Sequence, residues 1–333
     1  MRKVALLSDK EREELFSATA GRIGIRPEAV EKDFWVCYLL DHLFHDCIYK
    51  DAFVFKGGTS LSKAYHLISR FSEDIDLILD WRRIIRDDSD PWESRSKSKQ
   101  NQYNKQINAE AAAFYSSKLV PSLNGELYKK LGRENMFSVD PQDAMVVDFT
   151  YPKLFNGEYL RPSVRLEIGP LAEWTPSHII EIKPFVAEYY PKMFEQAGTE
   201  VLTIDAERTF WEKITILHKI ANFPEGKQLP NRYARHLYDV YCMGHTSVKD
   251  RAFERKELLS KDILFKQKFY YSKGAHYETA TLAEVNLIPR GDILPELRKD
   301  YKAMQNMIYG SIPSFEEILD YLQELQGEIH ALG

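Results

Sequence analysis

The sequence has few cysteines, no long apolar run and no excess of basic residues. Its 333 residues include three cysteines, Cys37, Cys47 and Cys242, which lack the spacing of a metal site. Such a sparse, odd count indicates reduced thiols, as in a cytoplasmic protein. No apolar stretch is long enough to cross a bilayer, and the charged segment 9–14 leaves no room for a signal-peptide core. The sequence therefore predicts a cytoplasmic protein with no membrane partner.

The charge balance argues against a general attraction to nucleic acid. Lysine and arginine number 45, and aspartate and glutamate number 50, which gives a formal net charge of −5. Any contact with RNA must therefore come from local basic patches. With 44% hydrophobic and 29% charged residues, the composition is that of an ordinary globular protein. A chain of 333 residues suits two domains, or one domain with a large helical extension.

One stretch of the chain combines several features of a phosphate site. An apolar run from Ala52 to Phe55 precedes Gly57 and Gly58, and a helical pattern over 61–68 follows. This order predicts a strand, a tight turn and then a helix. We expect Thr59 or Ser60 to cap that helix and the free amides of its first turn to bind a phosphate.

Two aspartates follow on the next predicted strand, residues 74–79. Because strand side chains alternate, Asp74 and Asp76 point to one face, and Ile75 and Leu77 point to the other. Neighbouring like charges repel, so the pair calls for a cation such as Mg²⁺ carried on a nucleoside triphosphate. A double glycine alone is usually a turn, and Asp-X-Asp alone is often a solvated edge. Their combination favours a metal and phosphate site.

This combination resembles the AbiEii/AbiGii family of nucleotidyltransferase toxins, within the polymerase-beta-like nucleotidyltransferase superfamily. The resemblance rests on Gly57-Gly58-Thr59-Ser60 followed by Arg70-Phe71-Ser72-Glu73-Asp74-Ile75-Asp76. Glu31-Lys32-Asp33 also looks like the N-terminal segment of the family, whereas some relatives have serine where this chain has Asp74. The resemblance implies that Asp74 and Asp76 are catalytic and bind Mg²⁺. It also implies that the nucleotide contacts Lys56, Gly57, Gly58, Thr59 and Ser60.

The rest of the pattern predicts an α+β fold, with a mixed sheet, flanking helices and a helical C-terminal region. Helices are expected over 8–20, where Ser8 and Glu11 form a capping box, over 27–44, and over 107–131 with a break or kink at Pro121. Strands are expected over 144–149, 164–168 and 179–182, and a connection over 184–203. The polar run 93–105 is expected to be a solvated loop, with an RNA-binding basic flap as the alternative. We predict a nucleotidyltransferase core at 1–195 and a helical domain at 196–333.

A third carboxylate is expected on a neighbouring strand. In the run 164–168, Glu167 shares a face with Arg165 and is either a solvated residue or an acidic group facing Asp74 and Asp76. The resemblance implies that Glu167 is this third catalytic, metal-binding carboxylate. Asp148 is the competing candidate.

Two further candidates lie in the predicted helical domain. Lys213 borders an apolar stripe that includes Phe210 and Ile214, so it either snorkels past its neighbours or reaches a buried anion. The resemblance makes Lys213 the catalytic lysine that contacts the triphosphate. It also makes Asp239 a required aspartate, which would hold Lys213 or another basic residue in place. Without the resemblance, the Asp239 flank is more often an internal salt-bridge network.

The resemblance implies a metal-dependent nucleotidyltransferase toxin of a toxin–antitoxin system. By resemblance, it would transfer a nucleoside monophosphate from an NTP to an acceptor hydroxyl, the 3′ end of tRNA. Its partner would be an AbiEi-type antitoxin, and the outcome would be growth arrest or phage defence. Two alternatives stay open, namely an enzyme of this fold that modifies a small molecule and a nucleotide-binding module without turnover. The first would need a compact acidic acceptor pocket, and Asp74, Asp76 and Lys213 together argue against the second.

Overall fold

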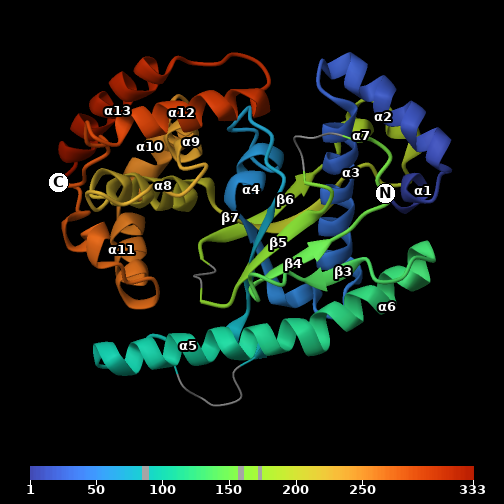
Figure 1. Cartoon of the computed structure of the whole chain (residues 1–333), viewed down its shortest axis with the longest axis horizontal. Coiled ribbons are helices and arrows are strands. Elements are labelled where there is room, and N and C mark those ends of the chain that lie inside the picture. Colours follow the sequence, from blue (N-terminus) through green and yellow to red (C-terminus); the bar gives the residue numbers. More distant parts are fainter. Residues whose placement is uncertain (85–89, 157–160, 172–174) are drawn as a thin grey trace. The chain divides into compact units, whose positions relative to one another are not determined.

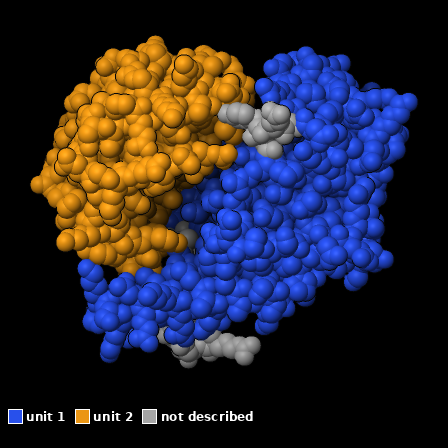
Figure 2. All heavy atoms as spheres, in the orientation of Figure 1, with its two compact units in different colours: residues 1–64, 72–204 blue, residues 65–71, 205–333 orange. Residues whose placement is uncertain are grey.

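The computed structural model describes residues 1–84, 90–156, 161–171 and 175–333. The chain forms two compact units, which Figure 2 colours separately. Unit 1 comprises residues 1–64 and 72–204, and unit 2 comprises residues 65–71 and 205–333. Unit 2 thus takes a short segment from the N-terminal half as well as the C-terminal region. The predicted division between residues 195 and 196 stays a prediction.

Unit 1 is built on a mixed sheet. In the described residues it has seven strands in the order β3-β4-β5-β2-β1-β7-β6. Strand β1 runs parallel to β7, and β2 runs parallel to β5, while the other neighbours are antiparallel. This sheet with its flanking helices confirms the predicted α+β class (Figure 1). The strands are β1 (Phe53–Lys56), β2 (Ile75–Leu79), β3 (Phe137–Val139), β4 (Val146–Phe149), β5 (Val164–Gly169), β6 (Ser177–Ile182) and β7 (Thr199–Ile204).

The two faces of this sheet differ in character. Leu77, Leu166 and Phe149 lie on one face, which packs against α3 (Pro27–Asp41), where Trp35 meets Phe149 with ring centroids 6.1 Å apart. On the other face Val54, Ile78 and Ile204 form a small apolar cluster. The polar residues of β2 and β5 share this second face with the cluster, because side chains two apart on a strand point the same way.

The helices of unit 1 confirm some boundaries and correct one. They are α1 (Arg2–Ala5), α2 (Asp9–Ile23), α3, α4 (Gly57–Lys63), α5 (Lys97–Phe114), α6 (Val120–Leu131) and α7 (Phe185–Tyr189). The capping box of Ser8 and Glu11 is present at the start of α2. The solvated loop expected over 93–105 is wrong from residue 97, because α5 starts there with the Ser96 hydroxyl as its cap. A π-helical turn, Tyr115–Leu119, joins α5 to α6 just before Pro121, so the chain changes helix type near the position where a break or kink was predicted. Figure 1 shows α5 and α6 as consecutive helices.

Unit 2 is helical, as expected for the C-terminal region. Its helices are α8 (Ala206–Ala221), α9 (Ala234–Gly244), α10 (Ser247–Glu254), α11 (Glu257–Phe269), α12 (Leu294–Met304) and α13 (Phe315–His330). The stripe of Phe210, Ile214 and Leu217 on α8 is buried. No helix among the described residues is long and apolar enough to span a membrane.

Two elements differ from the sequence prediction. The connection expected over 184–203 contains strand β7, whose side chains alternate between buried and more exposed positions from Thr199 to Leu202. The helical pattern predicted over 61–68 ends at Lys63, because residues 65–71 instead join unit 2. There the amide of Phe71 donates to the carbonyl of Met307 at 2.7 Å. This pairing to a distant segment overrides the local helical pattern.

Candidate functional site

Three charged side chains lie in one row across the sheet of unit 1. Lys56 at the end of β1 is the register partner of Asp76 on β2, and Asp76 is the register partner of Glu167 on β5. Register partners in neighbouring strands project to the same face. Asp74 lies immediately before β2, two residues from Asp76. Unit 1 therefore presents Lys56, Asp76 and Glu167 on one face of the sheet, with Asp74 two residues before Asp76. Their catalytic and metal-binding roles stay predictions.

Gly57 fits tightly against this row. Its φ of +79° is in the left-handed region, and an added Cβ would lie 2.8 Å from the Cβ of Asp76 and closer still to the Asp76 carboxylate. Only glycine allows both this backbone conformation and this close approach. The double glycine thus places the start of α4 directly against the acidic strand.

Thr59 and Ser60 do not cap α4 as predicted, because the helix begins two residues earlier, at Gly57. The Thr59 hydroxyl donates to the backbone carbonyl of Asp74, and the Ser60 hydroxyl donates to the carbonyl of Gly57 at 2.8 Å. Both side chains are buried. Thr59 therefore ties α4 to the residue that precedes β2.

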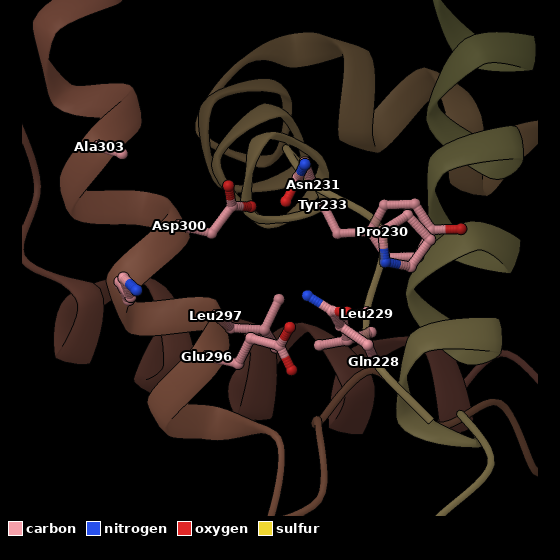
Figure 3. Close-up of a pocket in the computed structure, with 10 residues that line it drawn as sticks. Gln228, Leu229, Pro230, Asn231, Tyr233, Glu296, Leu297, Asp300 and Ala303 are labelled. Atoms are coloured by element: carbon pink, nitrogen blue, oxygen red, sulfur yellow. The ribbon is translucent and has the colours of Figure 1, made fainter. Parts of the chain in front are cut away.

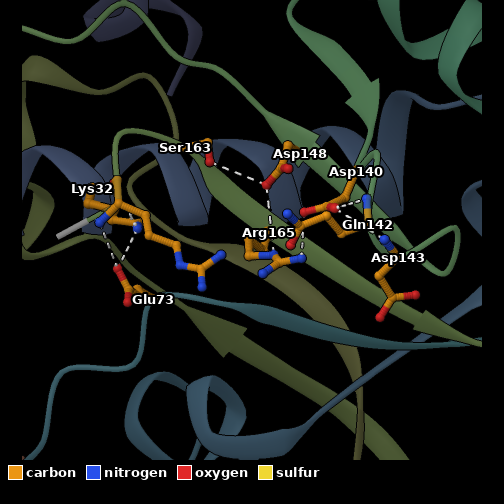
Figure 4. A network of polar contacts seen from close by, with 9 residues as sticks. Lys32, Glu73, Asp140, Gln142, Asp143, Asp148, Ser163 and Arg165 are labelled. Carbon is orange, nitrogen blue, oxygen red and sulfur yellow. Dashed lines mark hydrogen bonds and ion pairs between the residues drawn. The ribbon is translucent and has the colours of Figure 1, made fainter.

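The competing carboxylate, Asp148, has a different environment. On β4 it is the register partner of Arg165, whose Nε lies 3.8 Å from its carboxylate, and the Ser163 hydroxyl donates to it at 3.2 Å (Figure 4). Arg165 also donates to Asp140 at 2.8 Å. Glu167 is in register with Asp76, whereas Asp148 faces a cation. The register thus favours Glu167 as the third carboxylate.

The donor set of this row suits a hard divalent cation. Asp74, Asp76 and Glu167 offer carboxylate oxygens, which Mg²⁺ prefers, and the missing Gly57 side chain leaves backbone close to Asp76. Within the described parts of the chain, however, no three His, Cys, Asp or Glu side chains are already grouped as a metal site. The residues fit a metal that is completed by ligand oxygens from a bound nucleotide.

Unit 2 contains a buried cluster of charges around Asp239. Arg70 binds both carboxylate oxygens of Asp239, through Nε at 2.7 Å and Nη2 at 2.8 Å, and the ammonium of Lys213 lies 2.9 Å from Oδ2. Asp239 is fully buried on α9. Burial alone would raise the pKa of Asp239, but Arg70 and Lys213 outweigh it and hold that pKa below its usual range. Lys213 therefore does reach a buried anion.

His236 completes this cluster from one turn earlier on α9. Its Nδ1 lies 3.2 Å from the Lys213 ammonium, which has only hydrogens to offer, so Nδ1 accepts. Burial, reinforced by the charge of Lys213, lowers the pKa of His236 well below its usual value. Burial likewise lowers the pKa of Lys213, against the opposing effect of Asp239. A neutral His236 thus adds no charge to the cluster.

A cavity in unit 2 involves none of the predicted site residues. It measures about 250 Å³ and lies between residues 228–233 and α12, where Leu229 and Leu297 meet polar side chains (Figure 3). The Asp300 carboxylate on its wall already accepts from the backbone amides of Arg232 and Ala234, at 3.0 and 2.8 Å. Its polar wall thus serves in part to hold the start of α9.

Several residues that hold these groups were not predicted from the sequence to do so. Arg70 lies in the motif of residues 70–76, but its partner Asp239 is 169 residues away in the chain. Lys32 lies in the segment Glu31-Lys32-Asp33, and its partner is Glu73. A run of three charges in the apolar helix α3 was the available signal, because charges are rarely buried without partners. Whether the clusters of the two units meet on one nucleotide stays a prediction.

The chain is similar to proteins of one known family. The family described as nucleotidyl transferase AbiEii toxin, type IV toxin–antitoxin system, matches residues 38–321. A solved structure, MenT4, a nucleotidyltransferase toxin from Mycobacterium tuberculosis H37Rv, is similar with a TM-score of 0.41 and 15% identity, over 96% of this chain and 94% of that chain. No curated protein sequence matches the chain.

Proposed function

Because the chain belongs to the AbiEii family of nucleotidyltransferase toxins of type IV toxin–antitoxin systems, we propose that it transfers a nucleoside monophosphate to RNA. The enzyme is a nucleotidyltransferase, so its substrate is an NTP, and its family implies an antitoxin partner. We further propose that the acceptor is a hydroxyl at the 3′ end of tRNA and that the partner is an AbiEi-type antitoxin. The protein would act in the cytoplasm, and its activity would cause growth arrest or phage defence.

One observation carries this proposal, the row of Lys56, Asp76 and Glu167 with Gly57 packed against it. Nucleotidyl transfer requires anionic groups for a metal next to groups that accept phosphates. In the proposed site, Asp74, Asp76 and Glu167 hold Mg²⁺. When bound, the metal neutralises charge that develops on the leaving pyrophosphate.

The phosphates would lie at the start of α4. The first amides of a helix lack intrahelical partners, so those of Gly57, Gly58 and Thr59 are suited to phosphate oxygens. Lys56 adds a positive charge at the same point. Thr59 and Ser60 act here through their backbone, because their hydroxyls donate within the fold. Glu167 would take the proton of the attacking hydroxyl or help to bind a second metal.

Lys213 would add its charge to the triphosphate, with Asp239 fixing its position. Chain connectivity supports this step, because Arg70, which binds Asp239, precedes Asp74 by only four residues. An extended chain spans at most about 3.6 Å per residue, which limits the separation of the Arg70 and Asp74 Cα atoms to ~14 Å. The motif that supplies the acidic strand thus also supplies the partner of Asp239.

The proposal can be tested with NTPs labelled on either the α or the γ phosphate. Each labelled NTP is incubated with the protein, Mg²⁺ and total tRNA. We expect RNA to acquire label from the α phosphate only, since the β and γ phosphates leave as pyrophosphate. Label from the γ phosphate in RNA, or label on small molecules alone, would contradict the proposal.

Paired variants test the residues. Asp76→Asn and Glu167→Gln each remove a proposed metal ligand and should lower turnover about 100-fold or more, as expected for metal-site carboxylates. Asp148→Asn is the matched control on the neighbouring strand and should keep wild-type turnover. A larger loss in Asp148→Asn than in Glu167→Gln would reassign the third carboxylate.

A further inference from the structure

Helix α3 carries three consecutive buried charges, which is unusual for a helix in the centre of a unit. Glu31 and Lys32 have 0% exposure, and Asp33 has 2%. Removing a charge from water is strongly unfavourable unless partners compensate it. Since successive helix positions point in different directions, these three side chains reach three different segments of unit 1.

Lys32 binds the residue that precedes the acidic pair. Its ammonium lies 2.6 Å from the carboxylate of Glu73 and donates to the carbonyl of Arg161 at 3.1 Å (Figure 4). The backbone amide of Arg161 donates to the same Glu73 oxygen at 3.4 Å. Both members of the ion pair are almost inaccessible, at 0% and 2% for their side chains. Glu73 is therefore fixed from two sides, directly before Asp74.

Asp33 binds the end of α4. Its carboxylate lies 2.7 Å from the ammonium of Lys63 and also accepts from the backbone amide of Phe185 at 2.7 Å. The Lys63 ammonium sits 4.0 Å from the centroid of the Phe185 ring. Lys63 is the last residue of α4, whose first residue is Gly57. Asp33 thus anchors the helix that packs against Asp76.

These two anchors bracket the segment that joins unit 2. Lys63 lies two residues before residues 65–71, and Glu73 lies two residues after them. That segment includes Arg70, the bidentate partner of Asp239. We propose that Lys32 and Asp33 are positioning residues, which hold Glu73 and Lys63 so that Asp74, Asp76 and Gly57 keep their mutual geometry. This inference rests on the proposed function, because it assigns these anchors to the proposed metal site.

A purely stabilising role would lead to a different expectation. A buried ion pair adds little net stability, and apolar replacements of both partners are often neutral or stabilising. Groups that orient metal ligands behave differently, since their loss typically lowers metal affinity or activity 10- to 100-fold. A variant without either charge of the Lys32–Glu73 pair separates the two roles.

The test compares the full-length wild type with three full-length variants. Lys32→Met/Glu73→Met removes the buried pair, and Lys130→Met/Asp46→Asn removes another lysine–carboxylate pair of unit 1. Asp76→Asn removes a proposed metal ligand. Free Mn²⁺ is measured by electron paramagnetic resonance as each protein is titrated, urea unfolding reports stability, and the α-labelled NTP reports transfer. We expect the Lys32/Glu73 double variant to stay folded, to bind Mn²⁺ about 10-fold more weakly and to lose kcat at least as strongly. The Lys130/Asp46 control should match the wild type in both readouts.

The outcomes separate the two proposals. If Asp76→Asn weakens Mn²⁺ binding but the Lys32/Glu73 variant binds like the wild type, the positioning inference is overturned and the proposed function stands. If Asp76→Asn leaves Mn²⁺ binding and transfer unchanged, the proposed function fails, and the inference fails with it. Should the double variant not fold, Lys32→Arg keeps the charge and changes the length, and wild-type Mn²⁺ binding by Lys32→Arg overturns the inference.

Discussion

Replacing Gly57 by alanine tests the tight fit between α4 and the acidic strand. Two effects are expected, and they are separable. An L-residue at the observed φ of +79° costs ~1–2 kcal/mol. The added Cβ would lie 2.8 Å from the Cβ of Asp76, so the Asp76 side chain or the start of α4 must move. A displacement of about 1 Å at a reacting site costs ~100-fold in rate. We therefore expect Gly57→Ala to lose about 1–2 kcal/mol of stability and ~100-fold in transfer.

Gly24 provides a matched control in the same unit. It ends α2 with the same φ of +79°, and an added Cβ would meet nothing within 4 Å. Gly24→Ala should therefore lose a similar ~1–2 kcal/mol in urea unfolding and keep wild-type transfer of α-labelled NMP to tRNA. Wild-type transfer by folded Gly57→Ala, or an equal loss of transfer in both variants, would refute the reasoning.

Two further changes probe buried charges. Asp239→Asn leaves Lys213 and its neighbours without their anion, so it should cost ~3–5 kcal/mol of stability and most of the transfer activity. Asp262, a buried carboxylate of the same unit that lies 3.1 Å from Lys266, provides the control, because Asp262→Asn should lower stability but keep the kcat of the folded protein. Equal kcat losses in the two variants would contradict the role assigned to Asp239. Burial raises the pKa of Glu31 from 4.5 to about 7, so its contribution to stability is complete below pH 4.5 and is lost as pH rises through 7. The wild type should therefore lose ~3 kcal/mol relative to Glu31→Gln between pH 4.5 and 8 in denaturant titrations, and a pH-independent difference would contradict that ionisation.

Local signals in the sequence predicted much of the fold. Ser8 and Glu11 mark the start of α2, and the alternating pattern around Asp76 gave a strand with its acidic face. These features depend on neighbours in the chain, so they are visible without the structure. The strand β7 was missed although its pattern alternates, because the whole run 184–203 was interpreted as a connection between two regions.

The partners of the buried charges could not be predicted in the same way. Lys32 and Glu73 are 41 residues apart, and Arg70 and Asp239 are 169 residues apart. No periodicity links such positions, since tertiary packing alone brings them together. The sequence also could not decide whether Glu167 or Asp148 is the third carboxylate, because that choice depends on strand register and not on local pattern. A charged residue in an apolar helix indicates that a partner exists, but not which residue it is.

One bound nucleotide is proposed to contact Lys213 of unit 2 and, through the metal, the carboxylates of unit 1. An NTP that carries an acyl group on its terminal phosphate tests this directly, because it acylates a lysine amine that contacts the phosphates. We predict that mass spectrometry finds the acyl group on Lys213, that excess unmodified NTP with Mg²⁺ protects Lys213, and that Asp76→Asn greatly reduces the labelling. Acylation of other lysines only, or labelling of Lys213 that neither NTP nor Asp76→Asn affects, would contradict the claim.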